Sequence, residues 1–327
     1  MAHIVLGLGT SHSPQLSIPA EAWDLRGEED KKNPWFYTVP EGKHVTYEEL
    51  LAQADPAITK ELKPGVYKKR HEANQKGIRR VAEALEQANP DVLVMIGDDQ
   101  WEVFRDDNMP ALCVYWGDEV PYVPRRAEGG RSTLQYVAQM YPAEPQAYPG
   151  APDLAKHIIG SLMEQGVDVA HSHQLKEGQS ISHALTFVYA RILNGKSIPV
   201  VPVLQNTYFP PNQPTPRRSW EYGVALRNAI ETWKSRARVA VLGSGGMSHF
   251  VVDEEVDQLC LRVLKEKDLE AIAALPRERL KAGTSEVRNW ITVAGATQHL
   301  EMEVFDYVPC YRSPAGSGCA MAFAQWN

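Results

Sequence analysis

The 327-residue sequence has little of what marks several large classes of protein. Its four cysteines form no Cys-x-x-Cys pair, which argues against a disulfide framework and against a thiolate zinc site. No stretch approaches the ~20 consecutive apolar residues that a transmembrane helix requires. Acidic residues (41) outnumber basic ones (34), so the composition gives no support to a nucleic-acid-binding groove.

Internal repeats and low-complexity tracts are also missing, and no linker divides the chain convincingly. We therefore expect one domain over residues 1–327. The first ten residues have neither a basic region nor a small-residue cleavage site, and they predict a buried first strand rather than a signal peptide. Together with cysteines of the reduced type, this predicts a soluble, cytoplasmic protein.

Histidine is the residue that the sequence has in excess, with ten copies against four cysteines. Imidazole is the commonest side-chain ligand of transition metals. The ratio favours a metal site built from nitrogen and oxygen ligands, although most of the ten are expected to be ordinary surface or core residues.

Helical patterns recur directly ahead of short apolar strands. Residues 66–89 carry apolar or small side chains at helical spacing, Pro90 ends the pattern, and the apolar run 91–97 follows. The same succession is found three more times, with helices near 152–165, 182–193 and 219–234 and strands near 167–170, 198–204 and 239–243. This alternation predicts an α/β fold with a mainly parallel or mixed central sheet flanked by helices.

Three further features complete the predicted architecture. The prolines within 198–204 predict a weakened strand or one near the sheet edge. From about Asp253 the chain is predicted to be helical, before a loop-rich tail around 311–316. Long irregular stretches rich in proline and aromatic residues are predicted at 21–43, 121–149 and 208–216, and loops of this length commonly form active-site walls or oligomer contacts.

Polar residues directly follow three of the predicted strands, at 9–14, 97–102 and 243–249. Ligands of open α/β sheets bind beyond the carboxyl ends of the strands. His12 is therefore well placed to ligate a metal. The acidic run 253–257 is typical of a helix N-terminus, although one of its carboxylates could turn inward.

Several motifs carry a family resemblance. They are Thr-Ser-His-Ser-Pro at 10–14 and Gly-Ser-Gly-Gly-Met-Ser-His at 243–249, followed by Glu-Val-Asp at 255–257. In this order, over nearly the whole chain, they resemble the class III extradiol ring-cleavage dioxygenases of the protocatechuate 4,5-dioxygenase catalytic-subunit type. Segments 70–75, 97–100 and 283–290 are most similar to the 3-O-methylgallate dioxygenase branch.

The resemblance implies a mononuclear Fe(II) held by two histidines and one carboxylate, with open positions for substrate and dioxygen. His12 matches the first ligand and Glu255 matches the carboxylate. The implied activity is extradiol cleavage of a catechol or gallate-type aromatic acid such as 3-O-methylgallate, with O2 as the second substrate. The family is commonly multimeric, so a homo-oligomer is expected.

Two glutamines stand where this family has histidines. Gln100 occupies the place of a metal ligand, and Gln179 occupies that of a catalytic histidine. A neutral amide oxygen is a poorer Fe(II) ligand than imidazole, so three alternatives stay open for the third ligand: His71, Gln100 or neither of them. His71 equally fits an exposed residue in the first turn of its helix. His183, four residues after Gln179, is the alternative acid–base group.

The remaining candidates concern the substrate. His249 ends the glycine-rich turn and is expected to orient the iron ligands or to bind a substrate oxygen, and Gln179 is a second substrate-binding candidate. Cationic partners for a phenolate and a ring carboxylate could come from Arg125, Arg126, Arg217 and Arg218. Two other functions stay open: a catalytically eroded relative that binds an aromatic ligand or a protein partner, and a hydrolase using a zinc-activated water.

Overall fold

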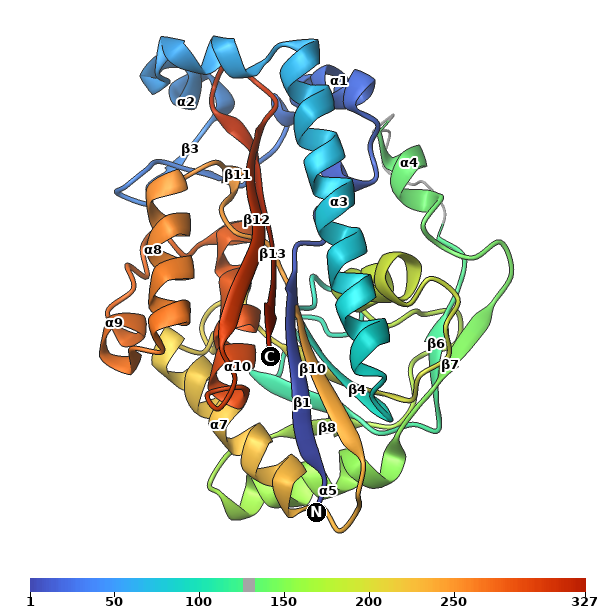
Figure 1. The fold of residues 1–327 in the computed structure, drawn as a ribbon. Coiled ribbons are helices and arrows are strands. Elements are labelled where there is room, and N and C mark those ends of the chain that lie inside the picture. Colours follow the sequence, from blue (N-terminus) through green and yellow to red (C-terminus); the bar gives the residue numbers. More distant parts are fainter. Residues whose placement is uncertain (126–132) are drawn as a thin grey trace.

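One large sheet organises the chain in the computed structural model, which describes residues 1–125 and 133–327 (Figure 1). Over this described part the sheet has nine strands in the order β11-β13-β1-β10-β4-β9-β5-β8, with β12 paired to β13 outside that path. The strands are β1 (His3–Thr10), β4 (Val92–Gly97), β5 (Leu112–Tyr115), β8 (Ala170–Ser172), β9 (Val200–Gln205), β10 (Arg238–Ser244), β11 (His249–Val251), β12 (Met302–Tyr311) and β13 (Ser317–Trp326). The predicted mixed α/β fold is confirmed.

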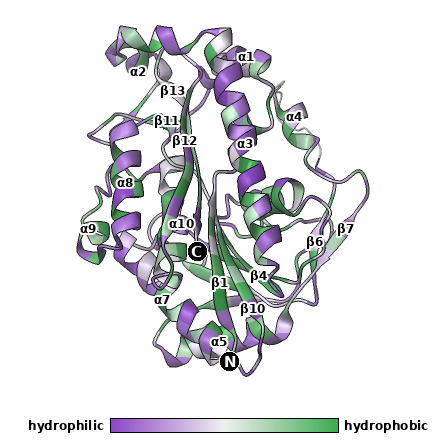
Figure 2. Ribbon diagram, viewed as in Figure 1, coloured by the Kyte–Doolittle hydropathy of each residue, from purple (hydrophilic) through white to green (hydrophobic). Residues whose placement is uncertain are grey.

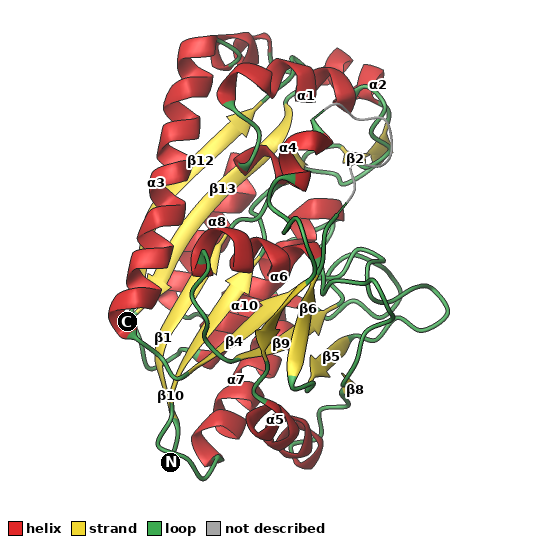
Figure 3. Ribbon diagram, turned by 90° about the vertical axis from the view of Figure 1, so that its right-hand side faces the viewer, coloured by secondary structure: helices red, strands yellow, loops and turns green. Residues whose placement is uncertain are grey.

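Strands β1, β10, β4 and β9 are mutually parallel and form the middle of the sheet (Figure 3). They are near-continuous apolar runs because both of their faces are covered. On β4, Leu93 and Met95 pack on one face, whereas Val94 and Ile96 pack on the other. Parallel strands end at the same edge, so the polar residues that follow β1, β4 and β10 are brought together there.

Helices cover both faces of the sheet. The helices α3 (Pro64–Ala88) and α6 (His183–Phe187), the latter continued by a π-helical turn (Val188–Leu193), pack on one face. The other face is covered by α5 (Pro152–Glu164), α7 (Pro216–Thr232), α8 (Glu254–Glu266) and α10 (Val287–Ala296). Hydrophobic residues concentrate on the central strands, while the helices alternate hydrophobic and hydrophilic residues, as their half-buried positions require (Figure 2).

Smaller elements complete the fold. The short helices are α1 (Trp23–Asp30), α2 (Tyr47–Gln53), α4 (Leu134–Ala138) and α9 (Leu269–Ala273), with 3-10 turns at Pro14–Leu16, Ala20–Ala22, Pro56–Glu61 and Ala282–Glu286. Two hairpins pair β2 (Phe36–Tyr37) with β3 (His44–Val45), and β6 (Glu119–Tyr122) with β7 (Gln146–Pro149). Among the described residues, no helix combines the length and the apolar character needed to cross a membrane.

Two local predictions need comment. The proline-containing strand β9 lies between β4 and β5, third from one end of the sheet, so it is near the edge without being the edge strand. It is accommodated because β5 pairs only with Val203 to Gln205, so Pro202 has a strand partner on one side alone. The predicted helical segment after Asp253 is present as α8, α9 and α10, but the chain then ends in the long hairpin β12–β13 and not in a loop-rich tail.

Candidate active site

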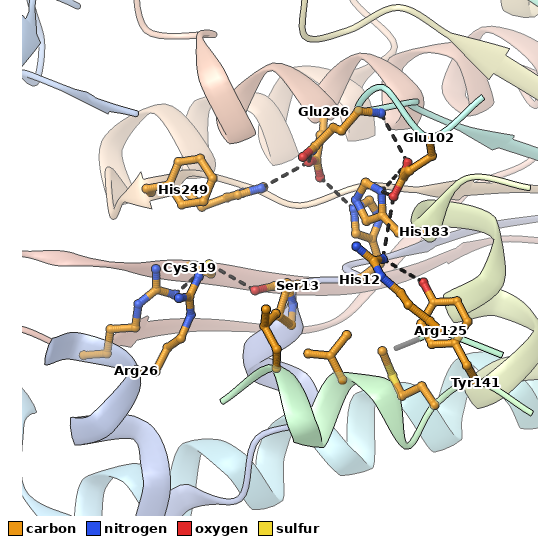
Figure 4. Close-up of a pocket in the computed structure, with 17 residues that line it drawn as sticks. His12, Ser13, Arg26, Glu102, Arg125, Tyr141, His183, His249, Glu286 and Cys319 are labelled. Atoms are coloured by element: carbon orange, nitrogen blue, oxygen red, sulfur yellow. Dashed lines mark hydrogen bonds and ion pairs between the residues drawn. The ribbon is translucent and has the colours of Figure 1, made fainter. Parts of the chain in front are cut away.

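A cavity of about 260 Å³ opens at the carboxyl edge of the parallel strands (Figure 4). Segments far apart in the sequence supply its wall: His12 follows β1, Gln100 and Glu102 follow β4, His183 begins α6, and Glu286 directly precedes α10. The convergence is the one expected from the strand order, since these segments follow or cover the same edge of the sheet.

The His12 ring is held in one orientation. Its Nδ1 lies 3.1 Å from Ser244 Oγ, and that hydroxyl in turn donates to the carbonyl of Ala184 at 2.6 Å. Because the serine proton is used in this way, the serine oxygen accepts from Nδ1–H of His12. The opposite nitrogen, Nε2, lies 3.3 Å from Glu286 Oε2, so without a metal ion it donates its proton to that carboxylate, and a bound metal ion would take the place of this proton. His12 is thus pre-oriented as a metal ligand.

Glu286 is the buried carboxylate at the centre of the site, with its side chain 1% exposed. Nitrogen atoms surround it: His12 at 3.3 Å, His249 Nε2 at 3.3 Å, Gln100 Nε2 at 3.2 Å and the backbone N–H of Gly246 at 2.9 Å. Burial alone would raise the pKa of this carboxyl, but the two imidazoles outweigh burial and hold it well below its ordinary value. Glu286 is therefore an anion and a competent ligand.

His249 donates from both ring nitrogens. Its Nδ1 lies 2.8 Å from the carbonyl oxygen of Met247, which can only accept, and its Nε2 faces Glu286. Burial opposes the charged imidazolium, yet Glu286 raises the pKa of His249 to about 9. This histidine lines the cavity and anchors Glu286 from the side opposite His12 (Figure 4).

Four side chains offer ligand atoms that all lie within 4.8 Å of one another: His12, Asp98, His183 and Glu286. Asp98 is fully buried, and burial followed by the charge of Glu286 raises its pKa to about 6. Two buried carboxylates this close repel each other unless a cation or a proton lies between them. Imidazole and carboxylate donors around such a point suit a divalent metal ion.

Gln100 lies beside the two carboxylates rather than opposite them. Its Nε2 is 3.3 Å from Asp98 Oδ2 and 3.2 Å from Glu286 Oε1. Since carboxylates only accept, the group between them must be the amide NH2 and not its oxygen. Gln100 therefore acts as a hydrogen-bond donor that steadies both acids.

His183 is paired with Glu102 next to His12. Its Nδ1 lies 2.8 Å from Glu102 Oε1, and its ring meets that of His12 edge-on, with 4.7 Å between the centroids. Burial lowers the pKa of His183, but the Glu102 carboxylate outweighs burial and raises it to about 10. Burial would raise the pKa of Glu102, but its interaction with His183 outweighs burial and lowers the pKa to about 2. His183 is thus a charged acid at the cavity wall.

Glu255, which the resemblance assigns as the carboxylate ligand, lies outside the cavity. Its side chain is 83% exposed and pairs with Arg279 at 3.1 Å. The reason is local: Asp253 caps α8 by accepting from the N–H of Val256, so Glu255 falls on the solvent-facing side of the first turn. The structure corrects this assignment, because the carboxylate beside His12 is Glu286.

His71 and Gln179 are also away from the cavity wall. His71 lies on α3 and lines a different cavity, beside Arg191. Gln179 Nε2 donates to the backbone carbonyl of Glu102 at 3.0 Å, so it supports the loop that carries Glu102. Neither residue is placed to bind the metal or substrate in the way that the sequence predicts.

Of the four predicted cationic side chains, the structure places one at the cavity. Arg125 lines it and lies 3.8 Å from Glu102, whereas Arg126 lies outside the described residues. Arg217 and Arg218 belong to α7 and pair with surface glutamates. Sequence reasoning missed two arginines that do line the cavity, Arg26 and Arg312.

Sequence reasoning missed Glu286 as a candidate site residue. It also missed the places of Asp98 and Glu102 in the site. A signal for Glu286 was present: it is the single acid between Leu280 and Glu301, and the uncharged helix segment 289–296 follows almost at once. A lone acid in such a setting must be buried and paired.

Comparison with known proteins agrees with this geometry. Residues 55–315 match the family described as the catalytic LigB subunit of aromatic ring-opening dioxygenase. A 2,3-dihydroxyphenylpropionate/2,3-dihydroxicinnamic acid 1,2-dioxygenase of Photorhabdus laumondii is 30% identical over 186 residues, covering 54% of this chain and 50% of that protein. Proteins of the same name from Comamonas testosteroni and Rhodococcus globerulus are 24% and 27% identical over 177 and 161 residues, covering 54% and 49% of this chain and 49% and 44% of their own lengths.

The chain spans about half the length of the curated relatives that it matches. The family match itself covers most of the chain and includes Asp98, His183 and Glu286. The chain therefore belongs to the family of catalytic LigB subunits of aromatic ring-opening dioxygenases.

Proposed function

We propose that this protein is an Fe(II)-dependent extradiol dioxygenase that cleaves the ring of a catechol or gallate-type aromatic acid. The observation that carries the proposal is the buried group of His12, Asp98, His183 and Glu286 at the wall of a cavity of about 260 Å³. Family membership and the names of the dihydroxyphenylpropionate dioxygenase relatives support the same reaction class.

His12 and Glu286 are the metal ligands in this proposal, and Asp98 supplies the third. The donor set is the reason: His12 Nε2 and the two buried carboxylates offer ligand atoms within 4.8 Å of one another. Fe(II) held there would supply chelation of two adjacent ring hydroxyls and a binding position for dioxygen. Gln100 donates hydrogen bonds from its amide NH2 to both carboxylates.

A matched pair of variants separates the two candidates for the third ligand. Asp98→Asn is expected to weaken metal binding by about 100-fold, because it removes a charged donor, and Gln100→Ala by less than about 10-fold, because Gln100 acts through hydrogen bonds. Calorimetric titration of the metal-free protein with Mn(II) measures both. A larger loss of Mn(II) affinity in Gln100→Ala than in Asp98→Asn would indicate that Gln100 is the third metal ligand.

His183 is the acid–base group of the proposed reaction. Glu102 fixes Nδ1, which leaves Nε2 to exchange protons with a substrate hydroxyl in the cavity. The charged form favoured by Glu102 makes His183 a proton donor at neutral pH, and its deprotonated form accepts the proton that a phenol loses. Glu102 returns the imidazole to the same orientation after each transfer.

The cavity walls suit an aromatic acid. The lining includes three apolar side chains that can pack against a ring, Leu134, Val137 and Phe250, and Arg125 lines the same cavity as a cationic partner for a carboxylate. The exact acid is proposed at the level of the class: dihydroxyphenylpropionate, protocatechuate, gallate and 3-O-methylgallate form the panel to be tested.

Oxygen consumption by anaerobically reconstituted protein tests the function. Fe(II)-loaded protein is expected to consume one O2 per catechol and to produce the ring-opened product, whereas Zn(II)-loaded protein consumes none. Full iron occupancy without oxygen uptake on any panel member would contradict the proposal and favour an eroded, ligand-binding relative. Turnover of an ester or amide by the zinc form under anaerobic conditions would indicate a hydrolase instead.

A further inference from the structure

A second cavity, of about 430 Å³, lies on the far side of Met140 from the catalytic one. Met140 lines both, and the second cavity runs between α3 and the π-helical turn that follows α6. A hollow of about 300 Å³ adjoins it and shares Gln139, Met140 and Arg191 with it. We call the joined space the Arg191 groove; its other lining residues include His71, Gln75, Tyr136, Tyr148 and Tyr189.

Arg191 brings an uncompensated positive charge to the groove. It donates to Gln75 Oε1 and, at 3.5 Å, to the carbonyl of Leu16 and to Ser17 Oγ, all of them neutral acceptors. No carboxylate lies within ion-pair distance of it in residues 1–125 and 133–327, and burial lowers its pKa. A half-buried guanidinium without a counter-ion is costly unless an anion binds there.

His71 adds an unsatisfied polar group next to this charge. Its Nδ1 is buried and has no hydrogen-bond partner among the described residues. Burial lowers the pKa of His71, and Arg191 acts in the same direction while Glu21 acts against it. Because Nδ1 is buried, the hydrogen bond that a neutral imidazole here can donate to an oxygen of a bound ligand comes from Nε2, and it adds no charge.

The other part of the groove offers aromatic surface. Tyr148 and Tyr189 stack with their centroids 3.9 Å apart and their planes 8° apart, and Tyr122 meets Tyr189 at 5.6 Å. The Tyr189 hydroxyl is a second buried group without a hydrogen-bond partner among the described residues. Tyr189 itself is fully buried, so the half-buried rings of Tyr136 and Tyr148 provide the aromatic surface, which next to one cation suits a planar ring that carries an acidic group.

We propose that the Arg191 groove is a second ligand site that binds a small aromatic carboxylic acid. The guanidinium of Arg191 takes the carboxylate in a two-pronged hydrogen bond, His71 donates to one carboxylate oxygen, and the ring lies against the tyrosines. Arg191 belongs to a π-helical turn, a local conformation that is frequent at functional sites. The site is independent of the ring-cleaving activity and does not require the metal.

Calorimetric titration of the metal-free full chain with 3,4-dimethoxybenzoate tests the proposal. This probe carries the carboxylate but lacks the adjacent hydroxyls that bind iron. We expect one site per chain, and binding at least tenfold weaker for the neutral analogue 3,4-dimethoxybenzamide. Arg191→Gln is expected to weaken the benzoate at least tenfold, whereas Arg227→Gln, an arginine on the surface of α7, leaves the affinity unchanged.

Arg191 also ties α6 to the segment after β1, so its variant could fail to fold. His71→Gln and Tyr148→Leu then serve as second probes, because each removes one predicted contact and leaves the arginine in place; each is expected to weaken binding severalfold. Unaltered binding in the variants of the groove would overturn the proposal. So would weakening by Arg125→Gln alone, because that result would put the probe in the catalytic cavity.

Discussion

The acidic residues at the starts of two helices, α8 and α10, lie in opposite environments. The first turn of α8 contains a cluster of acidic residues, and Glu255 among them is 83% exposed. A single acid, Glu286, directly precedes α10, and it is 1% exposed. Clustered acids repel one another and remain in solvent, where the helix dipole stabilises them. An isolated acid ahead of an apolar helix is carried into the interior and has to be paired there.

The acidic cluster of α8 nevertheless has a structural part in the site. Asp257 turns inward and accepts hydrogen bonds from the N–H and the hydroxyl of Ser248, both at 2.6 Å, and from Tyr307 at 2.8 Å. It therefore holds the glycine-rich turn that carries His249. One carboxylate of the acidic run does turn inward, as the sequence suggested. It is that of Asp257, and it holds the backbone and side chain of Ser248 instead of lying among the candidate metal ligands.

The sharpest test of the contrast is the pair Glu286→Gln and Glu255→Gln. Removing the buried carboxylate is expected to lower metal affinity by at least about 100-fold, because an anionic donor beside His12 is lost. The exposed residue is expected to leave metal affinity unchanged. Iron content after anaerobic loading and desalting measures both. Retained iron in Glu286→Gln, or lost iron in Glu255→Gln, would reverse the assignment.

The same contrast between buried and peripheral positions applies to histidine. His12→Ala is expected to abolish stoichiometric iron binding and ring cleavage, since His12 Nε2 faces Glu286 within the buried cluster. His71→Ala is expected to retain both, because His71 lines the Arg191 groove instead. Iron analysis together with oxygen uptake distinguishes the two, and loss of iron from His71→Ala at unchanged thermal stability would contradict the placement.

The sequence predicted what depends on local pattern. The alternation of helices and apolar strands predicted the central sheet. The rule that ligands bind beyond strand ends predicted that His12 lies at the edge of this sheet where the cavity opens. What it could not predict depends on distant pairing. Glu286 reaches the site only because α10 packs across the ends of β1 and β10, and β13 joins the sheet beside β1 although the sequence between them spans the whole domain.

Asp257 links the acidic cluster to the pH dependence of stability. Burial raises its pKa to about 7, despite hydrogen bonds from Ser248 and Tyr307 that lower it. The folded state thus holds this proton more tightly than the unfolded chain, so the stabilisation is complete at low pH and is lost as the pH rises toward 7. Asp257→Asn cannot ionise. The free energy of unfolding of the variant, relative to that of the wild type, should therefore rise by on the order of 2 kcal/mol between pH 5 and pH 8.

Urea unfolding of the metal-free protein at several pH values measures this difference. Glu255→Gln is the control, because it removes an exposed acid from the same run and should leave the pH profile parallel to that of the wild type. Parallel profiles for Asp257→Asn and the wild type would show that Asp257 ionises normally in the folded protein.

The smallest expected effect is that of Glu255→Gln on stability itself. The side chain is 83% exposed, and its partner Arg279 keeps two hydrogen bonds to Asp253 when Glu255 is changed. An exposed ion pair and a helix dipole together contribute about 0.5 kcal/mol at low ionic strength, and salt screens both. The loss in the free energy of unfolding should therefore shrink toward zero between 0.05 and 1 M NaCl. A loss above about 2 kcal/mol that persists in high salt would mean that Glu255 has a buried partner, and the contrast with Glu286 would fail.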